Sequence, residues 1–165
     1  MKILVPVSGS RNSLTAVRHA ARIARDRDAE IVLLNVQPAL TSYAAKHTSR
    51  EAREAMRNER AEAALDGSRR LSETLGVRWR ALTAVGPVAD TVVSVARELR
   101  VDQMVLATSP QAGWWQALVS PVGNILDSTE VPVVLVSGER PGVLKRYGLP
   151  ASVGLGLSAL IFALD

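Results

Sequence analysis

Residues 2–13 read KILVPVSGSRNS, and this stretch decides how the chain begins to fold. The run from Lys2 to Val7 is almost continuously apolar, which is typical of a strand that is covered on both faces. The Ser/Gly-rich turn after it offers several candidate helix N-caps. The next apolar side chains recur at helical spacing up to about Arg25: Leu14, Val17, Ala21 and Ala24. Strand, turn and helix form the first unit of an α/β protein.

The same alternation continues along the chain. Further strands are expected at 30–36, 77–85, 101–107 and 131–136. Helices are expected at 48–75, from the Gly86-Pro87 pair onward, and at 121–128, with Gly67 as a candidate break and Gly76 as a C-cap. The order predicts an open five-stranded parallel sheet with helices on both faces. Residues 77–85 alternate between polar and apolar, which favours a place near the sheet edge.

The composition of the 165 residues suits one folded domain, with 47 % hydrophobic and 22 % charged residues. The net charge is +4, and the arginines alternate with acids along the helical segments, which favours solvated helix faces. Nucleic-acid binding needs a one-sided basic stripe and stacking aromatics, and aromatics make up 4 % of the chain. We therefore expect no nucleic-acid partner.

The residues that usually perform catalysis or bind metals are scarce. There is no cysteine, and neither His19 nor His47 has neighbours at metal-ligand spacing. The acids of residues 26–30 lie at a helix-to-strand junction, where solvated surface is the default. We expect no catalytic residue, no metal and no enzymatic activity. The first apolar run is too short for a signal-peptide core, so a cytoplasmic protein is expected.

Several segments together resemble the universal stress protein family. They are VPVSGSRNS after the first strand, LLNVQP at the end of the second, the VGP helix start, and DQMVLATS with VPVVLVS in the last third. The resemblance covers residues 1–138. It implies a Rossmann-like sheet, a role in stress response, a homodimer paired through the last strand and, in one subgroup, ATP bound at the strand ends.

That ATP-binding subgroup carries Gly-x₂-Gly-x₉-Gly-Ser/Thr after the fourth strand, and this chain departs from it. The first two glycines fall at Ala107 and Pro110. The third falls at Ser120 by strict spacing, or at Val119 if the loop is one residue shorter. We prefer Val119, because Ser120 then becomes an N-cap before Pro121. Ser8 also stands where the subgroup has an aspartate that contacts the nucleotide.

These replacements remove the chemistry that holds phosphate. Such loops bind phosphate through converging backbone N–H groups, and Pro110 has no N–H and a fixed φ. A branched side chain at Val119 occupies space where backbone should approach a ligand. ATP as a cofactor is therefore disfavoured. The positions of this degenerate nucleotide site are Pro6, Val7, Ser8, Val36, Ala107, Pro110, Gly113, Val119, Ser120 and Val122.

Three further features have two interpretations each. Ser8 and Ser10 are either helix caps, which we favour, or ligand contacts. The Trp114-Trp115 pair either packs against apolar surface, which we favour, or stacks on a ligand. The last strand needs a cover, because an apolar edge strand otherwise promotes association. Pairing with a second copy would cover it through Val131, Val133, Val134, Leu135 and Val136, and the alternative cover is the C-terminal tail.

The C-terminal part lies outside the expected domain, which ends at residue 138. Residues 139–148 form a basic linker rich in Pro and Gly, and 149–165 form a hydrophobic tail. Leu149–Leu164 carries no charge. It either docks on an apolar groove of the protein or associates with a membrane, with Arg140, Lys145 and Arg146 beside it.

The leading hypothesis is a non-catalytic, dimeric universal-stress-type module that acts through an unknown protein partner, with weak or no ATP binding. The first alternative is a nucleotide-binding member with an altered phosphate loop. The second is a membrane-tethered stress adaptor.

Overall fold

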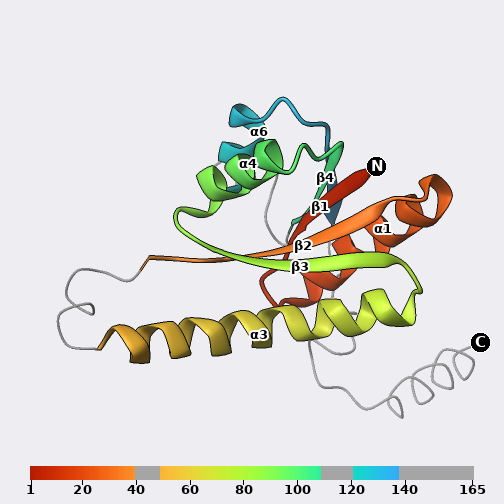
Figure 1. Cartoon of the computed structure of the whole chain (residues 1–165). Coiled ribbons are helices and arrows are strands. Elements are labelled where there is room, and N and C mark those ends of the chain that lie inside the picture. Colours follow the sequence, from red (N-terminus) through yellow and green to blue (C-terminus); the bar gives the residue numbers. More distant parts are fainter. Residues whose placement is uncertain (40–48, 109–120, 138–165) are drawn as a thin grey trace, which may run out of the picture.

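The computed structural model describes residues 1–39, 49–108 and 121–137. Strands and helices alternate along the chain (Figure 1). The strands are β1 (Lys2–Pro6), β2 (Glu30–Gln37), β3 (Arg78–Val85), β4 (Gln103–Thr108) and β5 (Val133–Ser137). The helices are α1 (Arg11–Arg27), α3 (Arg50–Thr74), α4 (Val88–Glu98) and α6 (Pro121–Ser128). The predicted sequence of elements is therefore confirmed.

The five strands form one parallel sheet in the order β3-β2-β1-β4-β5. Helices cover both faces, with α1 and α3 packed together on one face and α4 and α6 on the other (Figure 1). The open parallel sheet predicted from the sequence is confirmed. β3 is an edge strand, as its alternating side chains indicate, and β5 forms the opposite edge.

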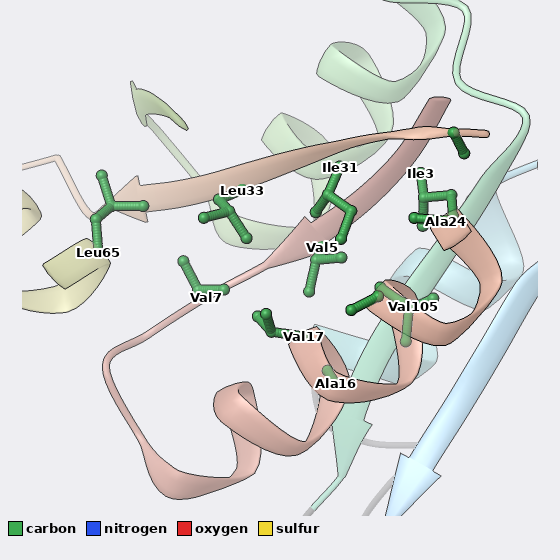
Figure 2. Close-up of a cluster of buried hydrophobic side chains, with 13 residues drawn as sticks. Ile3, Val5, Val7, Ala16, Val17, Ala24, Ile31, Leu33, Leu65 and Val105 are labelled. Carbon is green, nitrogen blue, oxygen red and sulfur yellow. The ribbon is translucent and has the colours of Figure 1, made fainter. Parts of the chain in front are cut away.

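Each face of the sheet has its own apolar core. Alternate residues of β1 and β2, such as Ile3, Val5 and Leu33, pack against α1 and Leu65 of α3 (Figure 2). The residues between them, such as Leu4 and Val32, pack against α4 and α6. Both sets are almost fully buried because successive strand side chains point to opposite faces and both faces are covered.

Helix α1 is defined at both ends by local chemistry. The Ser10 hydroxyl accepts a hydrogen bond from the N–H of Ser13, so Ser10 is the N-cap. The helix ends at Asp28, which adopts a left-handed conformation with φ of 48°. It is therefore two residues longer at its C-terminal end than its apolar spacing predicts, because Arg25 and Arg27 continue it on the solvent side.

Helix α3 is a single helix of 25 residues. The break considered at Gly67 is absent, because Gly67 lies in the helix and faces Leu14 of α1. Gly76 follows the helix with φ of +64°, as expected for a C-terminal glycine. None of the residues from Arg50 to Arg60 is buried, so only the C-terminal half packs in the core.

Several elements start one or two residues later than predicted, among them α3 at Arg50, β3 at Arg78 and β4 at Gln103. The last strand begins at Val133, so Val131 is not part of it; Val131 packs with the α4 and α6 core, and its N–H donates to the Thr129 hydroxyl. Pro132 has no N–H for strand pairing, which explains the later start. Pro87 is the N-cap of α4, so the helix begins at Val88, just after the Gly86-Pro87 pair, and Val88 is 38 % exposed.

The predicted linker at 139–148 and the tail at 149–165 lie outside the described residues. Within the described ranges, none of the helices combines the length and the hydropathy needed to cross a bilayer.

A candidate ligand cleft at the strand ends

The strand order creates a switch point beside β1. The chain proceeds from β1 outward to β2 and β3, and then returns to place β4 on the other side of β1. Helices that follow β1 and β4 therefore leave toward different faces, which opens a crevice beyond the carboxyl ends of these strands. Ligands of open α/β sheets bind in this place.

A cleft of about 350 Å³ lies at this switch point. Its volume falls in the range of pockets that hold small organic ligands. The ends of β1, β2 and β4 and the starts of α1, α4 and α6 contribute its walls. The described lining residues are Pro6, Val7, Ser8, Ser10, Asn12, Ser13, Leu34, Val36, Val88, Leu106, Ala107, Pro121, Val122 and Ile125.

Three serine hydroxyls form the polar wall of the cleft. The hydroxyl oxygens of Ser8, Ser10 and Ser13 lie 3.2–3.3 Å from one another, and each contacts the other two. The Ser8 N–H also donates to the Ser13 hydroxyl at 3.0 Å. The sequence folds this way because Ser10 caps α1 and Gly9, with φ of +75°, turns the chain back onto the helix start. Ser10 is a cap, whereas Ser8 joins the hydroxyl cluster beside it.

Buried amide side chains fix the end of β1 next to the cleft. Asn35 is 3 % exposed and donates from Nδ2 to the carbonyl of Val7 at 2.8 Å. Gln37 donates from Nε2 to the side-chain Oδ1 of Asn35 at 2.6 Å. These bonds satisfy polar groups that burial would otherwise penalise, and they tie β2 to the loop that carries Ser8. The sequence reading missed both residues, although two amides at alternate positions of an apolar strand could have indicated them.

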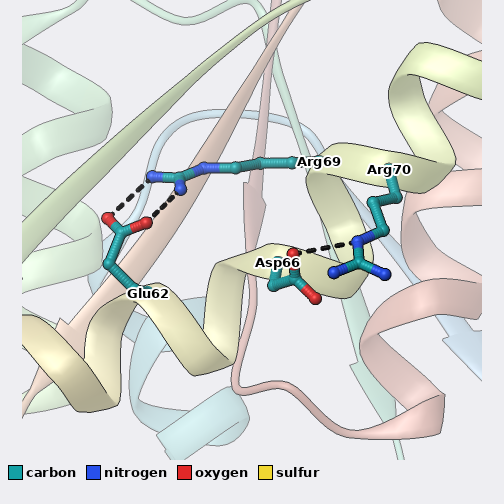
Figure 3. A network of polar contacts seen from close by, with 4 residues as sticks. All are labelled: Glu62, Asp66, Arg69 and Arg70. Carbon is teal, nitrogen blue, oxygen red and sulfur yellow. Dashed lines mark hydrogen bonds and ion pairs between the residues drawn. The ribbon is translucent and has the colours of Figure 1, made fainter.

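The described lining of the cleft contains no charged side chain. In the described ranges, no three His, Cys, Asp or Glu side chains gather as metal ligands would. The carboxyl groups with a clearly lowered pKa lie elsewhere, on α3. A hydrogen bond from Arg50 lowers the pKa of Glu54, and one from Arg69 lowers the pKa of Glu62 (Figure 3). Both carboxyl groups are exposed. Their lowered pKa values therefore reflect ion pairs on a solvated helix surface rather than a reactive site.

The described residues of the predicted nucleotide site come together in this cleft. Pro6 is the last residue of β1, and Val7 and Ser8 follow it. Val36 and Ala107 are the next-to-last residues of β2 and β4, and Val122 is the second residue of α6. Pro110, Gly113, Val119, Ser120 and the tryptophan pair lie outside the described residues. The sequence reading missed the cleft residues Asn12, Ser13, Leu34, Val88, Leu106, Pro121 and Ile125. Most of them could have been predicted by adding the residue two positions before each strand end and the first turn of each following helix, because these side chains face the same side.

The predicted dimer strand β5 lies at the sheet edge. Val134 and Val136 pack toward α1, Val133 packs toward the opposite core, and Leu135 is 46 % exposed. One side of β5 pairs with β4 from Val133 to Ser137. The strand therefore presents a partly exposed apolar edge.

The fold and the cleft define an open, doubly wound α/β protein with a ligand-sized pocket at its switch point. The sequence pattern of the universal stress protein family matches residues 1–137. The chain therefore belongs to the universal stress protein family, as its motifs predict.

Similar proteins agree with this assignment. A universal stress protein of Methanocaldococcus jannaschii is 29 % identical over 139 residues, which cover 82 % of this chain and 81 % of the relative. The solved universal stress protein UspA from Lactobacillus plantarum has a TM-score of 0.67 at 22 % identity and covers 82 % of this chain and 97 % of its own. An Arabidopsis thaliana family member solved with AMP bound has a TM-score of 0.63 at 20 % identity, covering 87 % and 97 %.

Proposed function

We propose that this protein is a non-catalytic module of the stress response that acts through protein contacts as a homodimer and binds ATP weakly or not at all. Weak ATP binding is supported by the described lining of the cleft, which offers serine hydroxyls, the Asn12 amide and apolar side chains but no charged group. Stress response follows from the family to which the chain belongs.

The charge of a triphosphate explains why ATP is disfavoured. The negative charges of a triphosphate lose bound water when the ligand enters a site, and several hydrogen-bond donors or cations must replace that water. Where some charges stay without such partners, the binding affinity is lower. A separate loss concerns the rest of the nucleotide, because Ser8 stands where the resemblance to the ATP-binding subgroup implies an aspartate that accepts hydrogen bonds from it. The Ser8 hydroxyl oxygen is engaged with Ser10 and Ser13. The N-terminus of α6 contributes only about 0.3–1 kcal/mol toward an exposed anion.

A nucleotide with a single phosphate is the second candidate for this cleft. The similar protein of Arabidopsis thaliana was solved with AMP, and a universal stress protein of Archaeoglobus fulgidus was solved with dAMP. The apolar walls of the cleft suit a base, and its volume suits a ligand of this size. The single phosphate group of AMP also requires fewer hydrogen-bond donors than the three phosphate groups of ATP.

Isothermal titration with Mg·ATP and with AMP tests the proposal on the full chain. We expect a Kd for ATP weaker than about 100 μM, which corresponds to less than about 5.5 kcal/mol of binding free energy. A Kd for ATP in the low micromolar range or tighter would refute it. AMP binding alone would favour the second candidate.

A variant that fills the cleft shows whether any binding occurs there. Val88→Trp adds a large side chain at the first residue of α4, at the cleft, where Val88 is 38 % exposed. Met56→Trp is the matched control, since Met56 is 41 % exposed on α3 and does not line the cleft. Binding at the switch point should be lost in the first variant and kept in the second.

The homodimer is supported by the edge position of β5. A strand with Leu135 partly exposed and an edge open in the described structure is typical of a surface that another strand covers. A second copy presents the same surface, so two β5 strands can pair around a twofold axis.

A further inference from the structure

Helix α1 has two faces of opposite character. Its inner face buries small and apolar side chains, including Ala16, Val17 and Ala20. The opposite face carries exposed arginines at spacings of seven, four and three residues, which is helical periodicity. We call this row the arginine stripe: Arg11, Arg18, Arg22 and Arg25. At 1.5 Å per residue, it runs for about 21 Å along the helix.

The positive charge of the stripe is not balanced by neighbouring acids. Helix α1 holds five of the 20 basic residues and one of the 16 acidic residues, so the rest of the chain has equal numbers of both. Within the described ranges, no carboxylate forms an ion pair with a stripe arginine. On α3, by comparison, three of the six arginines, Arg50, Arg69 and Arg70, each contact an acid on the same helix. The expected alternation of arginines with acids holds at the C-terminal end of α1, from Arg25 to Asp28, whereas no acid lies between Arg11 and Arg25.

The sequence after β5 contains a second membrane-compatible feature, the uncharged segment Leu149–Leu164. β5 ends at Ser137 and packs against α1. Residues 138–148 then link it to the uncharged segment Leu149–Leu164. Eleven residues can span up to about 36 Å, which is longer than the stripe itself. The apolar segment can therefore reach a surface that the stripe faces.

We propose that the arginine stripe of α1 is a docking surface for the anionic headgroups of a lipid membrane, with the apolar segment as the second anchor. A row of guanidinium groups that have no ion pair within the described ranges matches the phosphates of a headgroup layer. Stable peripheral attachment usually needs two signals, such as an apolar insertion together with a basic patch. This inference goes beyond the proposed function and holds whether or not the cleft binds a nucleotide.

A membrane explains these features better than a nucleic acid does. Single strands are held by aromatic platforms beside basic groups. The one aromatic residue in the described ranges, Trp79, lies on β3 at the edge opposite β5. A nucleic acid also leaves the uncharged C-terminal segment without a role.

Vesicle co-sedimentation of the full chain tests the proposal. Vesicles of phosphatidylcholine with a third of phosphatidylglycerol are compared with pure phosphatidylcholine. We expect binding to the anionic vesicles at about 0.1 M salt and strong weakening at about 1 M, where the Debye length is about 3 Å. Each arginine near such a surface contributes roughly fivefold in affinity, so Arg18→Gln/Arg22→Gln should weaken binding roughly 30-fold.

Two control variants separate the stripe from net charge and from misfolding. Arg70→Gln/Arg97→Gln removes the same charge from exposed positions on α3 and α4, and binding should stay within about twofold of the parent. Arg18→Lys/Arg22→Lys keeps the charge and should keep most of the binding. Thermal unfolding of all variants should match that of the parent, because exposed side chains outside the core are changed.

Three outcomes would overturn the proposal. Equal binding to neutral vesicles would leave the stripe without a role. Equal weakening in the Arg70/Arg97 control would reduce the effect to net charge. Tighter binding to duplex DNA than to anionic vesicles at the same salt, lost in Arg18→Gln/Arg22→Gln, would assign the stripe to nucleic acid.

Discussion

Gly9 lies directly against Ala64, so that a Cβ added to Gly9 would come within 3.1 Å of the Cα of Ala64. This contact joins the loop after β1 to helix α3. It keeps the loop that carries the serine cluster close to the core, and it leaves room there for a hydrogen atom only. The backbone φ of +75° at Gly9 adds a second demand for glycine.

Gly9→Ala should therefore destabilise the protein by about 1–3 kcal/mol, because the methyl group meets backbone and the conformation is strained. Gly67→Ala is the control. Its Cβ would make an ordinary contact of 3.6 Å with Leu14, and alanine favours the helix by up to about 1 kcal/mol. Urea unfolding followed by circular dichroism gives both values. Equal stabilities of the two variants would show that the Gly9 contact is not tight.

Ser10→Ala should lower the free energy of unfolding by about 1 kcal/mol, because it removes the hydroxyl that accepts the Ser13 N–H. Ser49→Ala removes the equivalent cap of α3, where the hydroxyl accepts from Ala52. The first turns of α3 bury no side chain, so they can fray without opening the core, and we expect a smaller loss, below about 0.5 kcal/mol. Chemical denaturation compares the two. A larger effect at Ser49 would indicate that these turns contribute to the cooperative core.

Leu135→Lys should convert the proposed homodimer into a monomer, since a charge placed on the middle of β5 opposes pairing of two edges. Val85→Lys places the same charge on β3, the other edge of the sheet, at a residue that is 49 % exposed compared with 46 % for Leu135. It should leave the association state unchanged. Sedimentation velocity over a range of concentrations distinguishes them, and loss of dimer in the β3 variant alone would move the interface to that edge.

The Glu62 carboxyl should titrate below its ordinary value of 4.5, because the hydrogen bond from Arg69 lowers its pKa (Figure 3). A lowered folded-state pKa contributes stability that is complete above the unfolded pKa and is lost as pH falls through the folded one. Arg69→Gln should return the Glu62 midpoint toward 4.5, as carbon-detected NMR can measure. The Asp66–Arg70 pair remains intact in this variant. An unchanged midpoint would mean that the pair does not persist in solution.

The strands and most helix positions could be predicted because each follows from a short pattern. Continuous apolar runs mark β1 and β2 as doubly covered strands, and Gly76 marks the end of α3. One error arose where a distant contact decides, and another where Pro132 delays the start of the last strand. Gly67 reads as a break but is helical, because it lies against Leu14 of α1. Val131 reads as part of β5 but packs with the core under α4 and α6.

The sequence by itself determined the alternation of strands and helices, the family, and the absence of glycines from the expected phosphate-loop positions. These depend on residue type and spacing, which are local. Only the tertiary structure decided that β1 lies between β2 and β4, which places Ser8 and Ala107 around one cleft. It also decided that Arg50, Arg69 and Arg70 of α3 meet acids, while no carboxylate in the described ranges pairs with the α1 stripe. Both results depend on which elements pack together in space, because burial and pairing are set by neighbours that are distant in sequence.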